Sequence, residues 1–297
     1  MTLDEDCNFK GKVLPGDEVQ ALGRQFRYLA RVVGDLARLD PQDRADNATA
    51  RRMAMELDRM TGGQRVGAGD FAECCLVGAV PDKALPVFWL GTGVLIHPRI
   101  VLTAKSALSG RGDVGPPNVA LFAADDIRGI DPKAFCQIGS VHRHPSEDLA
   151  MLVLDQPSSV EPVERATGIE IANCDQVELV GYGNHDAAGL VGFGEKRRVS
   201  VPVNVMRRSE IEDLAGAENI LGFRSRSEFV AGRKGSGRDS PNSDIGGPAY
   251  LHSDGACKLA GITSRASNET GDGCGDGGVY VRLDAVADWI EETIEAL

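Results

Sequence analysis

Ser243-Asp244-Ile245-Gly246-Gly247-Pro248 is a turn-rich stretch in the last fifth of this 297-residue chain. Its two glycines and its proline favour a turn, so we expect the stretch to form a loop. That loop would hold the carboxylate of Asp244, while the branched side chain of Ile245 would fill apolar space. Ile245 has no hydroxyl, thiol or amine, so it cannot attack a carbonyl carbon. A catalytic nucleophile would therefore have to come from another part of the chain.

The sequence around this loop, from about residue 60 onward, has the pattern of an all-β domain. Short apolar runs alternate with glycine-rich turns, which predicts a sandwich or a barrel. The runs lie at residues 75–80, 93–96, 100–103, 119–122, 149–154 and 177–180. The chain closes with a helical period, which predicts a C-terminal helix from Leu283, Val286, Trp289, Ile290, Ile294 and Leu297.

Residues 1–59 follow a different pattern. Apolar residues at helical spacing predict a helix over about 17–38, and a weaker stripe predicts a second helix over about 42–59. We therefore divide the chain into a helical hairpin, 1–59, and a β domain, 60–297. The hairpin either packs on the β domain or on itself, or it serves as a pro-region-like, oligomerising or partner-docking element.

Composition narrows the possible partners and compartment. The net charge of −12 disfavours nucleic acid and anionic membranes, and it either keeps the protein soluble or favours a basic protein partner. No apolar run is long enough for a membrane span, and the acidic N-terminus is unlike a signal peptide, so we expect a cytoplasmic protein. The seven cysteines show no CxxC spacing. We therefore expect free buried thiols, no metal site and no cofactor.

Three motifs in order resemble those of trypsin-like (chymotrypsin-fold) serine proteases. The opening stretch resembles Gly-Asp-Ser-Gly-Gly-Pro, with Ile245 in the position of the nucleophilic serine. Residues 91–107 resemble the segment around the catalytic histidine, and Ser106 stands in the histidine position. Residues 148–152 resemble the segment of the triad aspartate, which places Asp148 at that position.

This resemblance implies a chymotrypsin-like double β-barrel with a C-terminal helix, preceded here by the helical hairpin. It also implies that Asp148 is the only remaining triad member. With no histidine to orient, Asp148 is expected to be a buried carboxylate that accepts hydrogen bonds from Ser106 and Ser264. The family's disulfide beside the histidine would join positions 91 and 107, which are Gly91 and Ala107 in this chain.

The resemblance also assigns substrate-binding positions. Asp239 matches the aspartate that selects Arg and Lys, and Ser243 replaces the oxyanion-hole glycine. The strand that pairs with substrate backbone departs from the family, since Arg265 and Ala266 replace a tryptophan and a glycine and would narrow the pocket entrance. The pocket-equivalent residues are Asp239, Ser264, Arg265, Ala266 and Gly278.

Arg59-Met60 resembles the site at which the family's zymogens are cleaved. Cleavage would free an amine that inserts beside Asp244. The alternative is an uncut linker between the hairpin and the β domain.

These patterns together predict a non-catalytic pseudoprotease that acts as a protein- or peptide-binding regulatory module. Its partner would be an active protease or a segment that contains Arg or Lys. Two alternatives stay open. One is an endopeptidase with relocated catalytic residues, for instance Lys105 activating Ser106, and the other is a structural subunit of a protease-containing complex.

Overall fold

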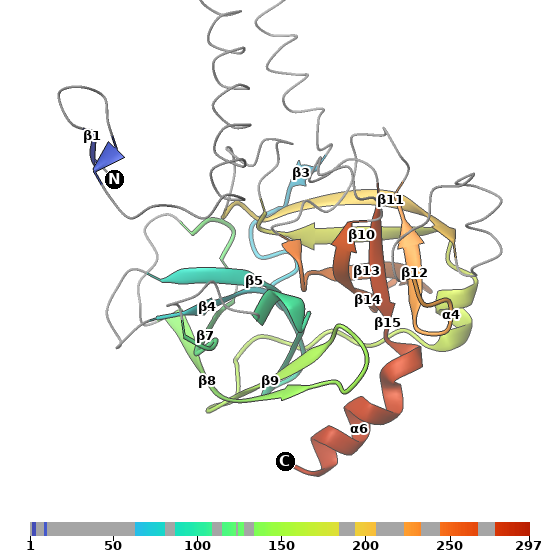
Figure 1. Ribbon diagram of the computed structural model, residues 1–297. Helices are drawn as coiled ribbons and strands as arrows, with labels where there is room; N and C mark the ends of the chain where they lie inside the picture. The colour runs from blue at the N-terminus through green and yellow to red at the C-terminus, as the bar shows by residue number, and fades with distance from the viewer. Residues whose placement is uncertain are drawn as a thin grey trace, which may run out of the picture.

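The computed structural model describes residues 2–3, 9–10, 63–80, 87–108, 115–122, 124–127, 134–183, 194–205, 223–232, 244–266 and 277–297. Two β-barrels lie side by side, and a helix ends the chain (Figure 1). The predicted double β-barrel with a C-terminal helix is therefore confirmed. The helical hairpin predicted over 17–38 and 42–59 lies outside the described residues.

The N-terminal barrel is closed by six antiparallel strands in the order β4-β5-β6-β9-β8-β7. Their bounds are β4 Cys74–Ala79, β5 Phe88–His97, β6 Ile100–Thr103, β7 Val119–Leu121, β8 Phe135–Arg143 and β9 Ala150–Leu154. Because side chains alternate along a strand, β6 contributes to two apolar clusters. Val101 packs in a cluster within this barrel, whereas Leu102 packs in a cluster that includes Tyr250 and Ile262 of the second barrel. The two barrels therefore share a core.

The C-terminal barrel has the strand order β10-β13-β14-β15-β12-β11, and a β10–β11 pairing closes it. The bounds are β10 Gln176–Gly181, β11 Arg197–Val205, β12 Glu228–Ala231, β13 Pro248–Ser253, β14 Ala256–Ala266 and β15 Gly278–Arg282. A short strand, β3 Gln64–Arg65, adds to the edge at β11. Helix α4, Gly168–Ala172, precedes β10 and begins with a capping box between Thr167 and Glu170.

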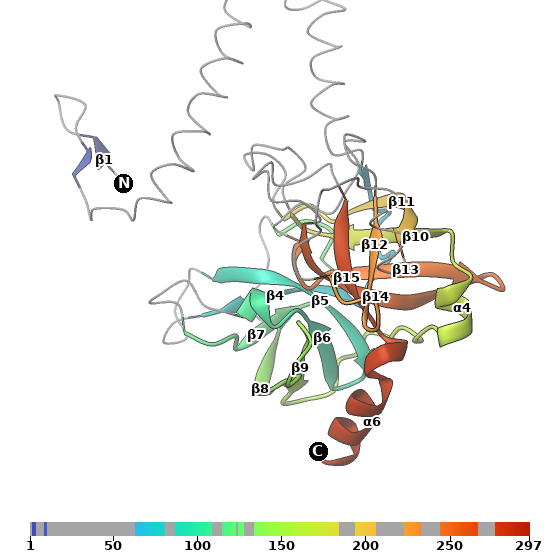
Figure 2. The same cartoon turned by 45° about the vertical axis from the view of Figure 1, so that its right-hand side comes forward.

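The C-terminal helix consists of a 3₁₀ turn, Asp284–Val286, followed by α6, Ala287–Glu295. Figures 1 and 2 both show it leaving the C-terminal barrel. Ile290 is buried in the shared core, and the Trp289 ring lies 4.9 Å from the ring of His144 in the N-terminal barrel. Leu297 was expected on the same apolar stripe, but it is 55% exposed because the helix ends two residues earlier. Neither α6 nor any other described helix has the length and apolar character needed to span a membrane.

The cysteines of the described part are free thiols, but only some are buried. Cys74 and Cys75 are fully buried in β4, as predicted. Burial raises the pKa of both thiols well above the ordinary value, so they behave as apolar core groups. The prediction was wrong for Cys136, Cys174 and Cys257, which are half-buried.

Candidate functional site

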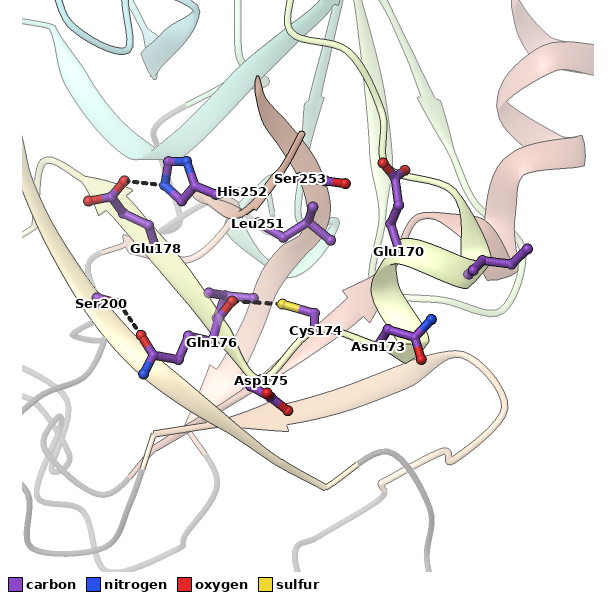
Figure 3. Close-up of a pocket in the computed structure, with 12 residues that line it drawn as sticks. Glu170, Asn173, Cys174, Asp175, Gln176, Glu178, Ser200, Leu251, His252 and Ser253 are labelled. Carbon is purple, nitrogen blue, oxygen red and sulfur yellow. Dashed lines mark hydrogen bonds and ion pairs between the residues drawn. The ribbon is translucent and has the colours of Figure 1, made fainter. Parts of the chain in front are cut away.

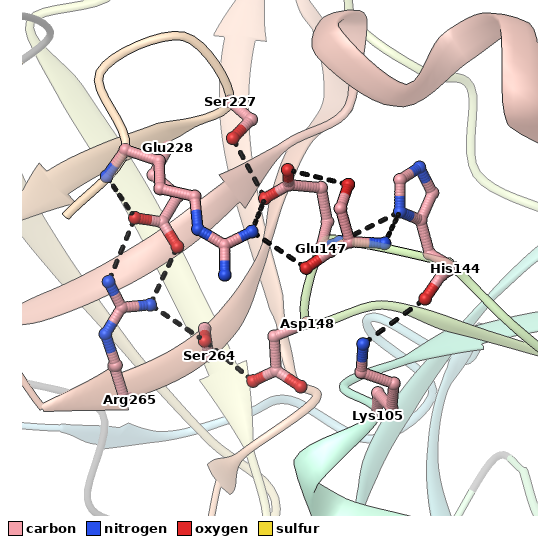
Figure 4. Close-up of polar contacts among 10 residues, drawn as sticks. Lys105, His144, Glu147, Asp148, Ser227, Glu228, Ser264 and Arg265 are labelled. Carbon is pink, nitrogen blue, oxygen red and sulfur yellow. Dashed lines mark hydrogen bonds and ion pairs between the residues drawn. The ribbon is translucent and has the colours of Figure 1, made fainter. Parts of the chain in front are cut away.

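Asp148 links the two barrels through hydrogen bonds from two serines. Ser106 follows β6 in a single 3₁₀ turn, Ser106–Leu108, and donates to the Asp148 carboxylate from its backbone N–H and its Oγ, both at 2.7 Å. Ser264 of β14 donates its Oγ to the same carboxylate at 2.7 Å, and Figure 4 shows that contact. Both partners predicted from the sequence are therefore present. The carboxylate is half-buried rather than buried because Ser106, which covers it on one side, is itself exposed.

Ile245 comes close to the 3₁₀ turn that carries Ser106. Its side chain is half-buried and packs against the shared core, and its carbonyl accepts a hydrogen bond from Thr92 N–H at 3.1 Å. A Cβ added at Gly91 would lie 2.7 Å from the Ile245 carbonyl oxygen and 2.9 Å from Cβ of Ala107. Positions 91 and 107 are thus adjacent, as the resemblance implies, and Gly91 allows the loop and the turn to meet.

In the described part of the opening stretch, residues 244–247 form the predicted loop and Pro248 begins β13. Gly246 has a φ of +87°, a left-handed conformation that glycine adopts without strain. A Cβ there would lie 2.1 Å from Thr103 Oγ1, so no larger residue fits. The Gly246 N–H donates to the Thr263 carbonyl at 2.8 Å, which fastens the loop to β14.

Asp244 is a buried carboxylate beneath this loop. It is 7% exposed and accepts the backbone N–H of Gly183 at 2.6 Å. Burial raises the pKa of this carboxyl to about 7, although hydrogen bonds from the backbone N–H groups of Gly183 and Tyr182 act in the opposite direction. The group therefore changes charge near neutral pH.

The variant Asp244→Asn is expected to alter how stability depends on pH. Between about pH 4 and pH 7 the folded chain keeps this proton while the unfolded chain, with an ordinary pKa of 3.8, releases it. The wild type should therefore lose stability relative to the variant as pH rises, by about 4 kcal/mol in total between pH 4 and pH 8. Urea unfolding of both proteins at several pH values measures the difference, and a difference that does not change with pH would contradict the prediction.

The end of β14 has the geometry of a strand edge that can accept another chain. Residues 265 and 266 pair with Val279 and Gly278 of β15, whereas the β13 pairing stops at Ile262. Within the described part of the chain, residues 264–266 therefore have a strand neighbour on one side. The other predicted site residues, namely Arg59, Met60, Asp239 and Ser243, lie outside the described residues.

A set of charged contacts beside this edge was not predicted from the sequence. Arg265 forms a two-pronged ion pair with Glu228 at the start of β12, at 2.7 and 2.9 Å. Glu228 is buried and also accepts the backbone N–H of Arg224 at 2.7 Å. Figure 4 shows Arg265 turned toward Glu228.

The contacts continue onto the N-terminal barrel through Arg224. Its Nη1 donates to the carboxylate of Glu147 at 3.1 Å and to the carbonyl of Ser146 at 2.8 Å. Ser227 Oγ donates to the same Glu147 carboxylate at 2.9 Å. We call Arg265, Glu228, Arg224, Ser227 and Glu147 the polar belt. The belt connects the turn before β12 to Arg265, which follows Ser264, and to Glu147, which precedes Asp148.

A separate pocket of about 580 Å³ lies on the C-terminal barrel beside α4 and β10 (Figure 3). Several of its polar groups are paired: Glu178 binds His252 at 3.1 Å, and Cys174 Sγ lies 2.7 Å from the Gln176 carbonyl. The Thr167 backbone N–H, with the ammonium of Lys258, lowers the pKa of Glu170 to about 2. No group of three or more potential ligands is placed to hold a metal in the part of the chain that the structure describes. These contacts do not form a catalytic arrangement.

Two closed six-stranded antiparallel barrels with a C-terminal helix define the trypsin-like protein class. The family model described as trypsin matches residues 74–290, and the chain belongs to the trypsin family. An "Uncharacterized peptidase" of Corynebacterium glutamicum (strain R) is 24% identical over 200 residues, which cover 67% of this chain and 62% of that protein. Trypsin eta of Drosophila melanogaster is 28% identical over 190 residues, which cover 58% of this chain and 66% of that protein. The match thus spans less than two thirds of either relative.

Proposed function

We propose that this chain is a non-catalytic member of the trypsin family that binds a protein or peptide partner. The observation that carries the proposal is the pair of 2.7 Å hydrogen bonds from Ser106 to Asp148. A catalytic triad needs an imidazole between the carboxylate and the nucleophile, since the imidazole accepts the proton. In our interpretation the hydroxyl of Ser106 occupies the position of the imidazole, and it donates a hydrogen bond to the Asp148 carboxylate.

The loop residue Ile245 supports the same proposal. A hydrocarbon at the position of the nucleophile provides no atom that could form an acyl-enzyme. The Ile245 side chain is half-buried and packs against the shared core, which is a structural role. Asp148 then serves to join the barrels through Ser106 and Ser264 rather than to orient a base.

The edge at residues 264–266 supports the binding part of the proposal. An extended peptide can add as a strand to such an edge, with backbone hydrogen bonds providing affinity. We infer a partner segment of this kind, from an active protease or another protein, and Asp239 would provide a site for an Arg or Lys side chain.

Calorimetric titration with peptides that contain or lack arginine tests this proposal. We expect measurable binding of extended peptides and tighter binding of those with arginine. Equal, negligible heats for all peptides would overturn peptide binding at this edge.

The peptidase names of the relatives favour one other candidate, a protease with relocated catalytic groups. Lys105 is the nearest base in sequence to Ser106, but its Nζ donates to the His144 carbonyl at 3.2 Å, and Ser106 Oγ is engaged with Asp148. Covalent labelling of Ser106 by a fluorophosphonate probe would support this candidate, and absence of labelling would reject it.

A further inference from the structure

The polar belt places its carboxylates inside and its guanidinium groups outside. The Glu228 side chain is 2% exposed, whereas its partner Arg265 is 32% exposed. The Glu147 side chain is 11% exposed, whereas its partner Arg224 is 50% exposed. A molecule that approaches the belt from solvent therefore meets the cationic member of each pair first.

The belt also lies where a bound peptide would pass. Arg265 is part of the 264–266 edge, and its neighbour Ser264 contacts Asp148. Arg224 reaches from the turn before β12 to Ser146 and Glu147, directly before Asp148 in the chain. A strand that pairs with residues 264–266 would consequently run beside both guanidinium groups.

Arg224 has geometric capacity for a second acidic partner. In its side-chain contacts with other described residues, Nη1 alone makes the bonds to Ser146 and Glu147. A guanidinium carries five N–H donors in a planar fork, so its outward side can bind another carboxylate.

Further cationic residues flank the belt. Arg226 in the same turn is exposed, Arg143 before His144 is exposed, and Lys105 is half-buried beside His144. With the two arginines of the belt, these cations outnumber the adjacent carboxylates of Glu147, Asp148 and Glu228, whereas the whole chain has a net charge of −12. Attraction between surfaces of opposite charge then favours an acidic partner at this place.

We infer that the 264–266 edge selects a peptide segment with acidic side chains, which Arg224 and Arg265 recognise. The inference rests on the proposed peptide-binding function and specifies the chemistry of the partner. The fitting segment therefore carries at least one acidic side chain within reach of these two guanidinium groups.

Three short peptides test this inference: acetyl-Glu-Glu-Ala-Arg-amide and its counterparts with two Gln or two Lys in place of Glu. We expect the Glu peptide to bind the full chain about 10-fold more tightly than the Lys peptide, with Gln between them. The preference should weaken as salt rises from about 0.05 to 0.5 M, because salt screens partly exposed charges.

A matched pair of variants locates the effect. Arg224→Gln should reduce the Glu-over-Lys preference to about 3-fold or less, since it removes one exposed guanidinium. Arg65→Gln is the control, because Arg65 is also exposed and ion-paired, to Glu195 at 3.0 Å, but it lies in β3, which pairs with the start of β11 and contains no residue of the belt. It removes the same charge and should leave the preference unchanged.

The outcomes separate the two proposals. Binding of all three peptides without a preference for Glu, or an equal effect of both variants, would overturn the acidic selectivity and leave peptide binding in place. Failure of every peptide to bind would overturn both.

Discussion

The full chain is expected to hydrolyse an arginine ester or amide at least about 10⁶-fold more slowly than an active trypsin-like protease. Removal of either the nucleophile or the base from a working triad costs about that factor, and the loss of both adds little. In this chain Ile245 provides no nucleophile, and Ser106 donates to Asp148 instead of accepting a proton. A chromogenic substrate assay over several days, with an active family member at equal concentration, measures the ratio.

Two variants serve as controls for this expectation. Ile245→Ser alone should remain inactive and unlabelled by a fluorophosphonate, since no base would activate the new hydroxyl. Any gain should require Ser106→His in the same chain, because only then can Asp148 orient an imidazole. Turnover by the wild type that a fluorophosphonate abolishes would contradict the proposed loss of catalysis.

The architecture could be predicted because it depends on local patterns. Apolar runs such as 100–103 and 149–154 correspond to buried strands, and the turn residues between them limit the strand lengths. Helix termination was harder to predict. The apolar period runs on to Leu297, but α6 ends at Glu295 and leaves that side chain exposed. The spacing of apolar residues predicts which face of a helix can be buried. It does not predict where the surface on which that face packs comes to an end.

The candidate site could be predicted only in part. The contacts of Asp148 with Ser106 and Ser264 were expected from the family positions that the resemblance assigns to these three residues, and they are present. The polar belt could not be predicted, because Arg224 meets Glu147 across 77 residues and Arg265 meets Glu228 across 37. These residues do not belong to a common sequence motif. A charged residue in a turn is also usually exposed to solvent, so the sequence does not indicate that Arg224 binds another side chain. Only the fold brings them together.

Arg265→Met is expected to destabilise the chain by about 3–5 kcal/mol, because it would leave Glu228 as a buried carboxylate without its charge partner. The Glu228 side chain is 2% exposed, so water cannot replace the lost ion pair. The remaining bond from Arg224 N–H, at 2.7 Å, compensates only part of the cost. Urea unfolding of variant and wild type near neutral pH measures the loss.

The same argument predicts that a second change restores stability. Adding Glu228→Gln to Arg265→Met removes the uncompensated charge while its amide oxygen can still accept the Arg224 N–H, so the double variant should regain at least about half of the loss. Arg198→Met is the matched control on the same barrel. Its ion pair with Glu178 spans 3.5 Å and its side chain is 42% exposed, so its loss should cost at most about 1 kcal/mol. If Arg265→Met costs no more than Arg198→Met, or if Glu228→Gln gives no recovery, the Arg265–Glu228 pair does not stabilise the turn before β12 in the way its burial implies.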